Sequence, residues 1–214
     1  MARFKDGLLG AFTGKAGNIV ASMWRNIRVV KAAGPSTRNN NSPAQVEQQA
    51  RFNLASSFVR NMSELFDLTY ESVADQMTAQ NKAIGAVVKE AIIGDYPNFT
   101  IDYPEVVVSR GSLKKERKQD ITVTVAAGIL TWKWKYVQRK LAKSVNTDKV
   151  FLLAYCPAFD SYEVEDFGPG RTTNLATLNV TSFVGQTVET WIAFVSVDKK
   201  KFSDSVYTGQ VAVV

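Results

Sequence analysis

The chain has 214 residues, of which 45% are hydrophobic and 21% are charged, an ordinary composition for a globular protein with one large or two small domains. It contains no histidine and one cysteine, Cys156, so the commonest general base is missing and neither an intrachain disulfide nor a cysteine-rich metal site can form. We therefore expect no catalytic residue, no metal and no cofactor, and a buried, inert Cys156 thiol.

The charge alternates in sign along the chain. Residues 1–42 carry a net +6, residues 43–113 carry −4, residues 114–147 carry +7 and residues 148–214 carry −3, which leaves +6 for the whole chain. Blocks of alternating sign suit packing within one chain or between copies of it, and they leave basic surface that nucleic acid could contact.

No apolar run is long enough to span a membrane, and Lys15 interrupts the apolar part of the N-terminus. We therefore expect no membrane span and no secretory signal peptide. The protein would then be made in the cytoplasm, as part of a particle or filament.

Residues 1–34 predict a small β-meander. Strand-forming residues place strands near Leu8–Thr13, Asn18–Trp24 and Ile27–Lys31, with turns at Gly14–Gly17 and Arg25–Asn26. A sheet of this size is marginal by itself, so it should pack on a helix or pair with another chain. We interpret the segment as an assembly arm whose contact residues are Phe12, Ile19, Trp24, Arg25, Arg28 and Lys31.

Two amphipathic helices are predicted after the polar linker Ala33–Asn41. The first runs over Ser42–Phe66, with Ser42 as N-cap and a broad apolar stripe along its length. The second runs from Thr78 as N-cap to Ile93, and Gly94 ends it. We expect the two helices to form an antiparallel pair.

An extended segment with two prolines, Tyr96–Leu113, follows the helices, and Glu105–Ser109 within it predicts a strand. The basic run KKERK, which begins at Lys114, marks the predicted domain boundary. The N-terminal domain of arm and helices would occupy residues 1–113, and a β domain residues 114–214.

Seven short strands separated by turns fill the second domain and favour a β-sandwich with Trp132 in its core. The order of features resembles a fibronectin type III or immunoglobulin-like domain. The predicted fold class is therefore α+β. The strands are expected near Ile121–Ala126, Ile129–Lys135, Lys149–Cys156, Tyr162–Asp166, Thr173–Val180, Val188–Val197 and Val206–Val213.

Two basic stretches in the second domain are candidates for anion or nucleic-acid contact, because cations interleaved with aromatic residues suit phosphates and bases. The alternative is that Lys133 and Lys135 are the solvent-facing alternates of Trp132 and Trp134, and that the following loop is merely solvated. The candidate contact residues are Lys114, Lys115, Arg117, Lys118, Lys133, Lys135, Arg139, Lys140 and Lys143.

Several short motifs resemble a family of uncharacterised proteins from Bacteroidota, filed as a domain of unknown function. They are the opening MARFKDG, GKAGNIV near Trp24, the segment Ala44–Phe52, YPNFTIDY, and VVVSRG at Val106–Gly111. The resemblance implies a bacterial or bacteriophage-related source and carries no activity with it.

The leading functional hypothesis is a structural, self-assembling homo-oligomer, such as a virion-type tail, tube or coat component or a surface-fibre subunit. It would assemble by edge-strand addition and by charge-complementary docking of the basic arm. The alternative is a nucleic-acid-binding accessory protein that uses the basic arm and the loop at residues 133–143. An enzyme using carboxylates alone is not expected, nor is a small-molecule substrate.

Overall fold

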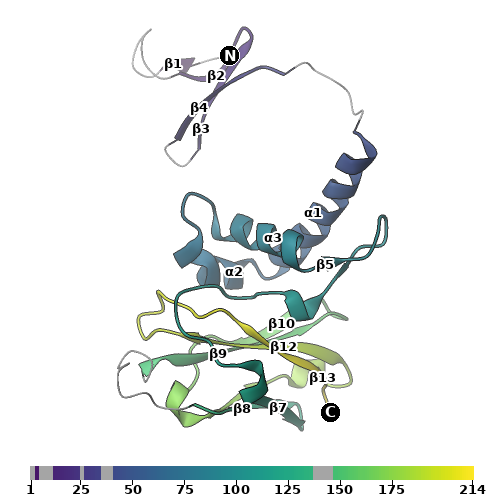
Figure 1. Cartoon of the computed structure of the whole chain (residues 1–214), viewed down its shortest axis with the longest axis vertical. Helices are drawn as coiled ribbons and strands as arrows, with labels where there is room; N and C mark the ends of the chain where they lie inside the picture. Colours follow the sequence, from purple (N-terminus) through teal and green to yellow (C-terminus); the bar gives the residue numbers. More distant parts are fainter. Residues whose placement is uncertain (1–2, 5–11, 25–26, 35–40, 137–146) are drawn as a thin grey trace. The chain divides into compact units, whose positions relative to one another are not determined.

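The computed structural model describes residues 3–4, 12–24, 27–34, 41–136 and 147–214 of the chain. Contacts between Cα atoms divide the protein into two compact units, Met1–Pro43 and Ala44–Val214. Each unit is built of antiparallel sheets, and the second also holds three α-helices, which confirms the predicted α+β class (Figure 1).

The first unit is a four-stranded antiparallel sheet in the order β1-β2-β3-β4. The strands predicted at Asn18–Trp24 and Ile27–Lys31 are confirmed as β3 and β4. Of the strand predicted at Leu8–Thr13, Phe12 and Thr13 lie in β2 and the rest lies outside the described residues, and β1 was not predicted. The predicted turn at Gly14–Gly17 begins three residues too early, because Ala16 still pairs with Ile19 and leaves Gly17 and Asn18 as the turn. Gly17 has φ = 58°, which a residue without a side chain adopts most easily. The strands are β1 Arg3–Phe4, β2 Phe12–Ala16, β3 Ile19–Trp24 and β4 Ile27–Ala32.

The single helix predicted over Ser42–Phe66 is two helices, α1 at Pro43–Asn61 and α2 at Ser63–Tyr70. The chain bends at Met62, where φ is −118° and ψ is 36°. The Met62 amide bonds to the carbonyl three residues back rather than four, and its side chain is fully buried. The bend thus changes the helix direction while Met62 remains in the core.

The helix α3 spans Ala79–Glu90, and the Thr78 hydroxyl caps it by accepting a hydrogen bond from the Asn81 amide, as predicted. The predicted end at Ile93 is wrong, because Ile92–Ile93 form the strand β5, which pairs with β6 at Thr100–Ile101.

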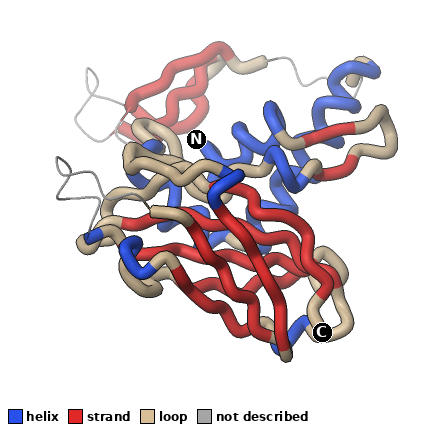
Figure 2. Tube along the Cα trace, turned by 60° about the horizontal axis from the view of Figure 1, so that its bottom comes forward, coloured by secondary structure: helices blue, strands red, loops and turns tan. Residues whose placement is uncertain are grey.

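All seven predicted strands of the β domain form, with ends shifted by at most two residues. They make a four-stranded sheet in the order β10-β9-β12-β13 and a three-stranded sheet in the order β11-β8-β7. Figure 2 draws the strands in red and the helices in blue. The bounds are β7 Ile121–Ala126, β8 Ile129–Trp134, β9 Lys149–Cys156, β10 Ser161–Glu165, β11 Leu175–Asn179, β12 Thr187–Val195 and β13 Val206–Ala212.

The four-stranded sheet is the middle layer of the second unit. On one face its central strands β9 and β12 share a buried cluster with the helices, through residues such as Leu153 and Trp191. On the other face they share a second buried cluster with the three-stranded sheet, through Leu152 and Ile192 against Trp132. Both strands are therefore buried on both faces.

The segment Val106–Leu113 joins the helices to the sheets. The strand predicted at Glu105–Ser109 does not form, because side chains satisfy the backbone there in place of a ladder. Trp191 Nε1 donates to the Val106 carbonyl over 3.0 Å, Tyr70 donates to that of Val107, and Ser205 Oγ accepts from the Val108 amide over 2.9 Å. The predicted domain boundary after residue 113 thus falls inside the second unit.

Candidate assembly and anion-contact site

The arm sheet exposes apolar side chains. Ile19, Met23 and Val30 have 46%, 57% and 63% of their surface accessible, and every residue of β4 is exposed. In the described part of the arm only Ala21 is buried. An exposed apolar face of this kind is typical of a surface that contacts another molecule.

The strand register places the exposed residues of the arm on common faces. Val30 lies opposite Ala21, which pairs in turn with Gly14 on the next strand. Arg28 lies opposite Met23, so the face that carries Val30 is apolar with a cation near one end. Among the described strands β4 pairs only with β3, so its outer edge is open.

Three of the six predicted arm residues can be placed with their side chains. Ile19, Arg28 and Lys31 are exposed, and Lys31 lies opposite Val20. The backbones of Phe12 and Trp24 lie in β2 and β3, whereas their side chains lie outside the described residues. Arg25 lies outside the described residues altogether.

The first basic stretch precedes β7, and its cations are exposed but partly paired. Lys115 Nζ lies 3.8 Å from an oxygen of Asp204, and Arg117 Nε donates to Asp120 over 2.9 Å. Lys118 Nζ lies 5.1 Å from the centre of the Tyr207 ring. Lys114 is exposed and forms no ion pair with any residue that the structure describes.

Lys133 and Lys135 are the solvent-facing alternates of Trp132 and Trp134, as one of the two predicted interpretations requires. Both tryptophans are buried between the sheets, and both lysines are exposed. The Lys135 amide bonds to the Asp120 carbonyl over 3.0 Å, so the two basic stretches meet there. The predicted contact residues Arg139, Lys140 and Lys143 lie outside the described residues.

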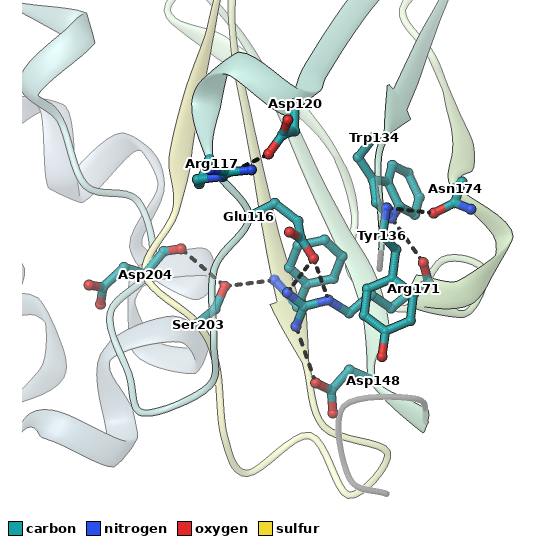
Figure 3. Close-up of polar contacts among 11 residues, drawn as sticks. Glu116, Arg117, Asp120, Trp134, Tyr136, Asp148, Arg171, Asn174, Ser203 and Asp204 are labelled. Carbon is teal, nitrogen blue, oxygen red and sulfur yellow. Dashed lines mark hydrogen bonds and ion pairs between the residues drawn. The ribbon is translucent and has the colours of Figure 1, made fainter. Parts of the chain in front are cut away.

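A buried ionic network around Arg171 was not predicted. Its side chain is 1% exposed, and it donates to Glu116 from Nε over 3.0 Å and from Nη2 over 2.6 Å. Nη1 lies 3.5 Å from an Asp148 oxygen, an ion pair without hydrogen-bond geometry (Figure 3). The guanidinium also lies 4.0 Å from the centre of the Phe194 ring.

Two effects act in opposite directions on the pKa of Asp148 in this network. Burial raises the pKa of its carboxyl group, and the positive charge of Arg171 lowers it in part. Trp134 donates to the Arg171 carbonyl over 2.9 Å, and the Arg171 amide donates to the Asp148 carbonyl. The network therefore ties the segment before β7 to β8, β9 and the turn before β11. No sequence signal distinguishes Arg171 from a solvated arginine, because arginine is usually exposed.

A second polar cluster lies at the end of the middle sheet near α1. The Tyr155 hydroxyl donates to Asp160 over 2.5 Å, and the Tyr207 hydroxyl donates to the buried Glu189 over 2.6 Å. Burial and these hydrogen bonds raise the pKa of both tyrosines. In both cases a carboxylate accepts a hydrogen bond from a protonated phenol. These bonds hold β9 to the turn at Asp160 and β13 to β12.

The open edge of the middle sheet is acidic. Among the described strands β10 pairs only with β9, and its residues Glu163 and Glu165 are followed by Asp166. A cleft of about 510 Å³ lies beside the end of this strand, lined by Glu165, Gly168, Pro169, Thr173, Leu175, Ala176 and Thr177.

Cys156 is fully buried, as predicted. In the part of the chain that the structure describes, no group of three or more potential ligand side chains is placed to hold a metal ion. None of the described helices is long and apolar enough to cross a lipid bilayer.

Comparison with known proteins identifies a family for this chain. A search of curated proteins and a search of solved structures each returned nothing similar. The model of a family described as "Family of unknown function (DUF6266)" matches residues 11–209, which is most of the chain. The expected resemblance to a domain of unknown function is thereby confirmed, and the protein belongs to the DUF6266 family.

Proposed function

We propose that the protein is a structural subunit that assembles with copies of itself, as a virion-type tail, tube or coat component or as a surface-fibre subunit. One observation carries the proposal: the arm sheet leaves Ile19, Met23 and Val30 about half exposed or more, and its last strand has an open edge. The arm carries a net +6 within residues 1–42, so it suits an acidic surface on a neighbouring copy.

The physical argument is that a four-stranded sheet with almost no buried residue gains little from folding by itself. Covering its apolar side chains would contribute about 25 cal/mol for each Å² removed from water. An open strand edge offers unpaired backbone groups to another strand. Docking on a neighbouring copy would both cover the apolar side chains and pair the open strand edge.

The finer parts of the proposal follow from the order of elements and from the motifs quoted above. We propose that the two packed sheets are of the immunoglobulin or fibronectin type III kind and that the source is bacterial or phage-related, within Bacteroidota. The protein would then be a building block without catalytic activity, a role that sandwich domains often fill.

The test of assembly compares the full chain with an arm variant. Sedimentation velocity and electron microscopy at high protein concentration and low salt should show large particles or filaments for the natural sequence. Ile19→Glu with Met23→Glu should reduce assembly strongly, because each carboxylate would have to be desolvated in the contact.

A matched control places the same two charges elsewhere. Val184 and Val197 are 56% and 57% exposed in the second unit, so Val184→Glu with Val197→Glu should leave assembly unchanged. A natural chain that remains monomeric under all these conditions would remove the proposed function.

A second candidate function is nucleic-acid binding, favoured by the exposed Lys114, Lys133 and Lys135, which form no ion pair with described residues. Binding to single-stranded DNA should weaken steeply with salt, with a slope of log K against log salt of about −0.7 for each phosphate contacted. Lys133→Glu with Lys135→Glu should flatten that slope by about 1 or more in a fluorescence anisotropy titration. Affinity that is insensitive to both salt and these substitutions would contradict this candidate.

A further inference from the structure

Each of the two units presents a strand that pairs on one side only among the described strands, β4 in the arm and β10 in the second unit, and these two edges carry opposite charge. The edge of β4 in the arm carries Arg28 and Lys31, and the edge of β10 in the second unit carries Glu163, Glu165 and, just beyond the strand, Asp166. Arg28 and Lys31 form no ion pair with any described residue. Unpaired edges of this kind are templates for strand addition.

We propose that β4 of one copy adds antiparallel to the open edge of β10 in a second copy. This inference rests on the proposed function and names the surface on which the arm docks. It predicts a continuous sheet formed by the four strands of the arm and the four strands of the middle sheet.

One antiparallel register matches the two strands residue by residue. It places Arg28 opposite Asp166, Val30 opposite Val164 and Lys31 opposite Glu163. Val30 and Val164 are 63% and 38% exposed. The register therefore pairs two exposed valines, and it places an ion pair between opposite charges on each side of them along the strand. Directly opposite residues in an antiparallel pair are close enough to contact, and opposite charges there are favourable.

The partners that these carboxylates have in the single chain are exchangeable. Asp166 accepts from Lys199 over 2.8 Å with both side chains nearly half exposed, and Glu163 accepts from Ser182 over 2.8 Å. An exposed ion pair of that kind is weak. Arg28 and Lys31 can therefore replace these contacts without leaving a buried group unpaired.

The cleft beside β10 fits the same arrangement. In the proposed register Val29 lies opposite Glu165, which lines the cleft together with Leu175. Ile27 lies on the same face of β4 as Val29, because side chains two residues apart share a face. The exposed Ile27 and Leu175, at 41% and 45%, would then cover each other.

Chain length favours a second copy over the arm's own second unit. In the register Ala32 lies beside Tyr162, close to Asp160, which accepts a hydrogen bond from Asn61 at the end of α1. The linker of residues 33–42 would have to return along the whole of α1, which is about 28 Å long. Its ten residues reach about 33–36 Å when fully extended, so an intramolecular contact would stretch it almost completely once the width of the helix is added.

A contact between the arm of one copy and the sheet edge of the next is heterologous. Such contacts generate closed rings or open filaments, because each copy docks its arm on one neighbour and offers its own β10 edge to the arm of another. The inference therefore adds a geometry to the proposed function: assembly proceeds head to tail along one direction.

Charge reversal tests the pairing. Arg28→Glu with Lys31→Glu, and separately Glu163→Lys with Asp166→Lys, should each raise the concentration needed for assembly by about tenfold or more, measured by sedimentation velocity. An equimolar mixture of the two variants should assemble again, because each arm then meets an edge of opposite charge. Lys82→Glu with Lys89→Glu on α3 is the control with the same charge change and should assemble normally.

A crosslink tests the register directly. The variant Val30→Cys with Val164→Cys should form a ladder of covalent multimers on oxidation, and Val29→Cys with Val164→Cys should not. A covalent monomer, together with a mixture of the charge variants that remains monomeric, would show that the arm docks within its own chain and would overturn the inference. Assembly that persists in both charge variants would overturn it while leaving the proposed function intact, and a natural chain that never assembles would remove both.

Discussion

Arg171 connects three chain segments through a single buried side chain. It bonds Glu116 twice, lies 3.5 Å from Asp148 and covers the Phe194 ring. Arg171→Met should lower the free energy of unfolding by about 3–5 kcal/mol at pH 7, because two poorly hydrated carboxylates lose their shared cation. Urea unfolding followed by circular dichroism measures this loss.

The control is Arg117→Met, in which a side chain that is 75% exposed loses a surface pair; a change of at most about 1 kcal/mol is expected. The loss caused by Arg171→Met should also shrink as the pH falls. Without the guanidinium only burial acts on Asp148, so its folded pKa rises further above the unfolded value of about 3.9, and the folded state binds the proton more tightly. A loss that stays equally large as the pH is lowered from 7 to the unfolded pKa of about 3.9 would contradict this account of Asp148.

The segment Val106–Leu113 shows how an element without a ladder is held. Ser205 Oγ accepts from the Val108 amide over 2.9 Å, the Ser205 amide bonds to the Ser109 carbonyl, and the side chain of Ser205 is buried. Gly111 lies so close to the chain that a Cβ there would be 2.3 Å from the Phe202 carbonyl oxygen. Ser205→Ala should therefore cost about 1–3 kcal/mol of unfolding free energy, because a buried amide loses its acceptor.

Ser57, which is exposed on α1, gives the matched control: Ser57→Ala should change the unfolding free energy by no more than about 0.5 kcal/mol. Thermal or urea unfolding of the two variants side by side makes the comparison. Equal effects would mean that the Ser205 hydroxyl does not support this segment.

The seven strands β7–β13 were predictable because alternation and turn residues mark them clearly, whereas the two-residue strands β5 and β6 were not predicted. The break at Met62 was not, since neither proline nor glycine stands there and the burial of Met62 by distant residues sets the bend. The strand expected at Glu105–Ser109 failed for a related reason: its backbone carbonyls accept hydrogen bonds from the distant side chains of Thr69, Tyr70 and Trp191 in place of a ladder. The local sequence pattern therefore predicts the paired strands well and the segments that connect them poorly.

At the scale of the molecule, the sequence predicted two packed sheets and did not predict the helices on the far face of one of them. The signal was present, because Trp191, Ala193 and Val195 are as apolar as the alternate residues that face the other sheet, and a strand apolar on both sides is buried on both sides. Among the predicted site residues, the exposure of Lys133 could be predicted, because it alternates with the apolar Trp132 along the strand. The Arg171 network depends on contacts between segments far apart in sequence and could not be predicted.

The middle position of β12 has a consequence for how the second unit comes apart. Helices and outer sheet each protect one side of the same strand, so loosening either layer lets water reach the core that supports the other. The two layers should therefore melt in one cooperative transition, and the amide protons of β9 and β12 should be the last in the protein to exchange with solvent deuterium.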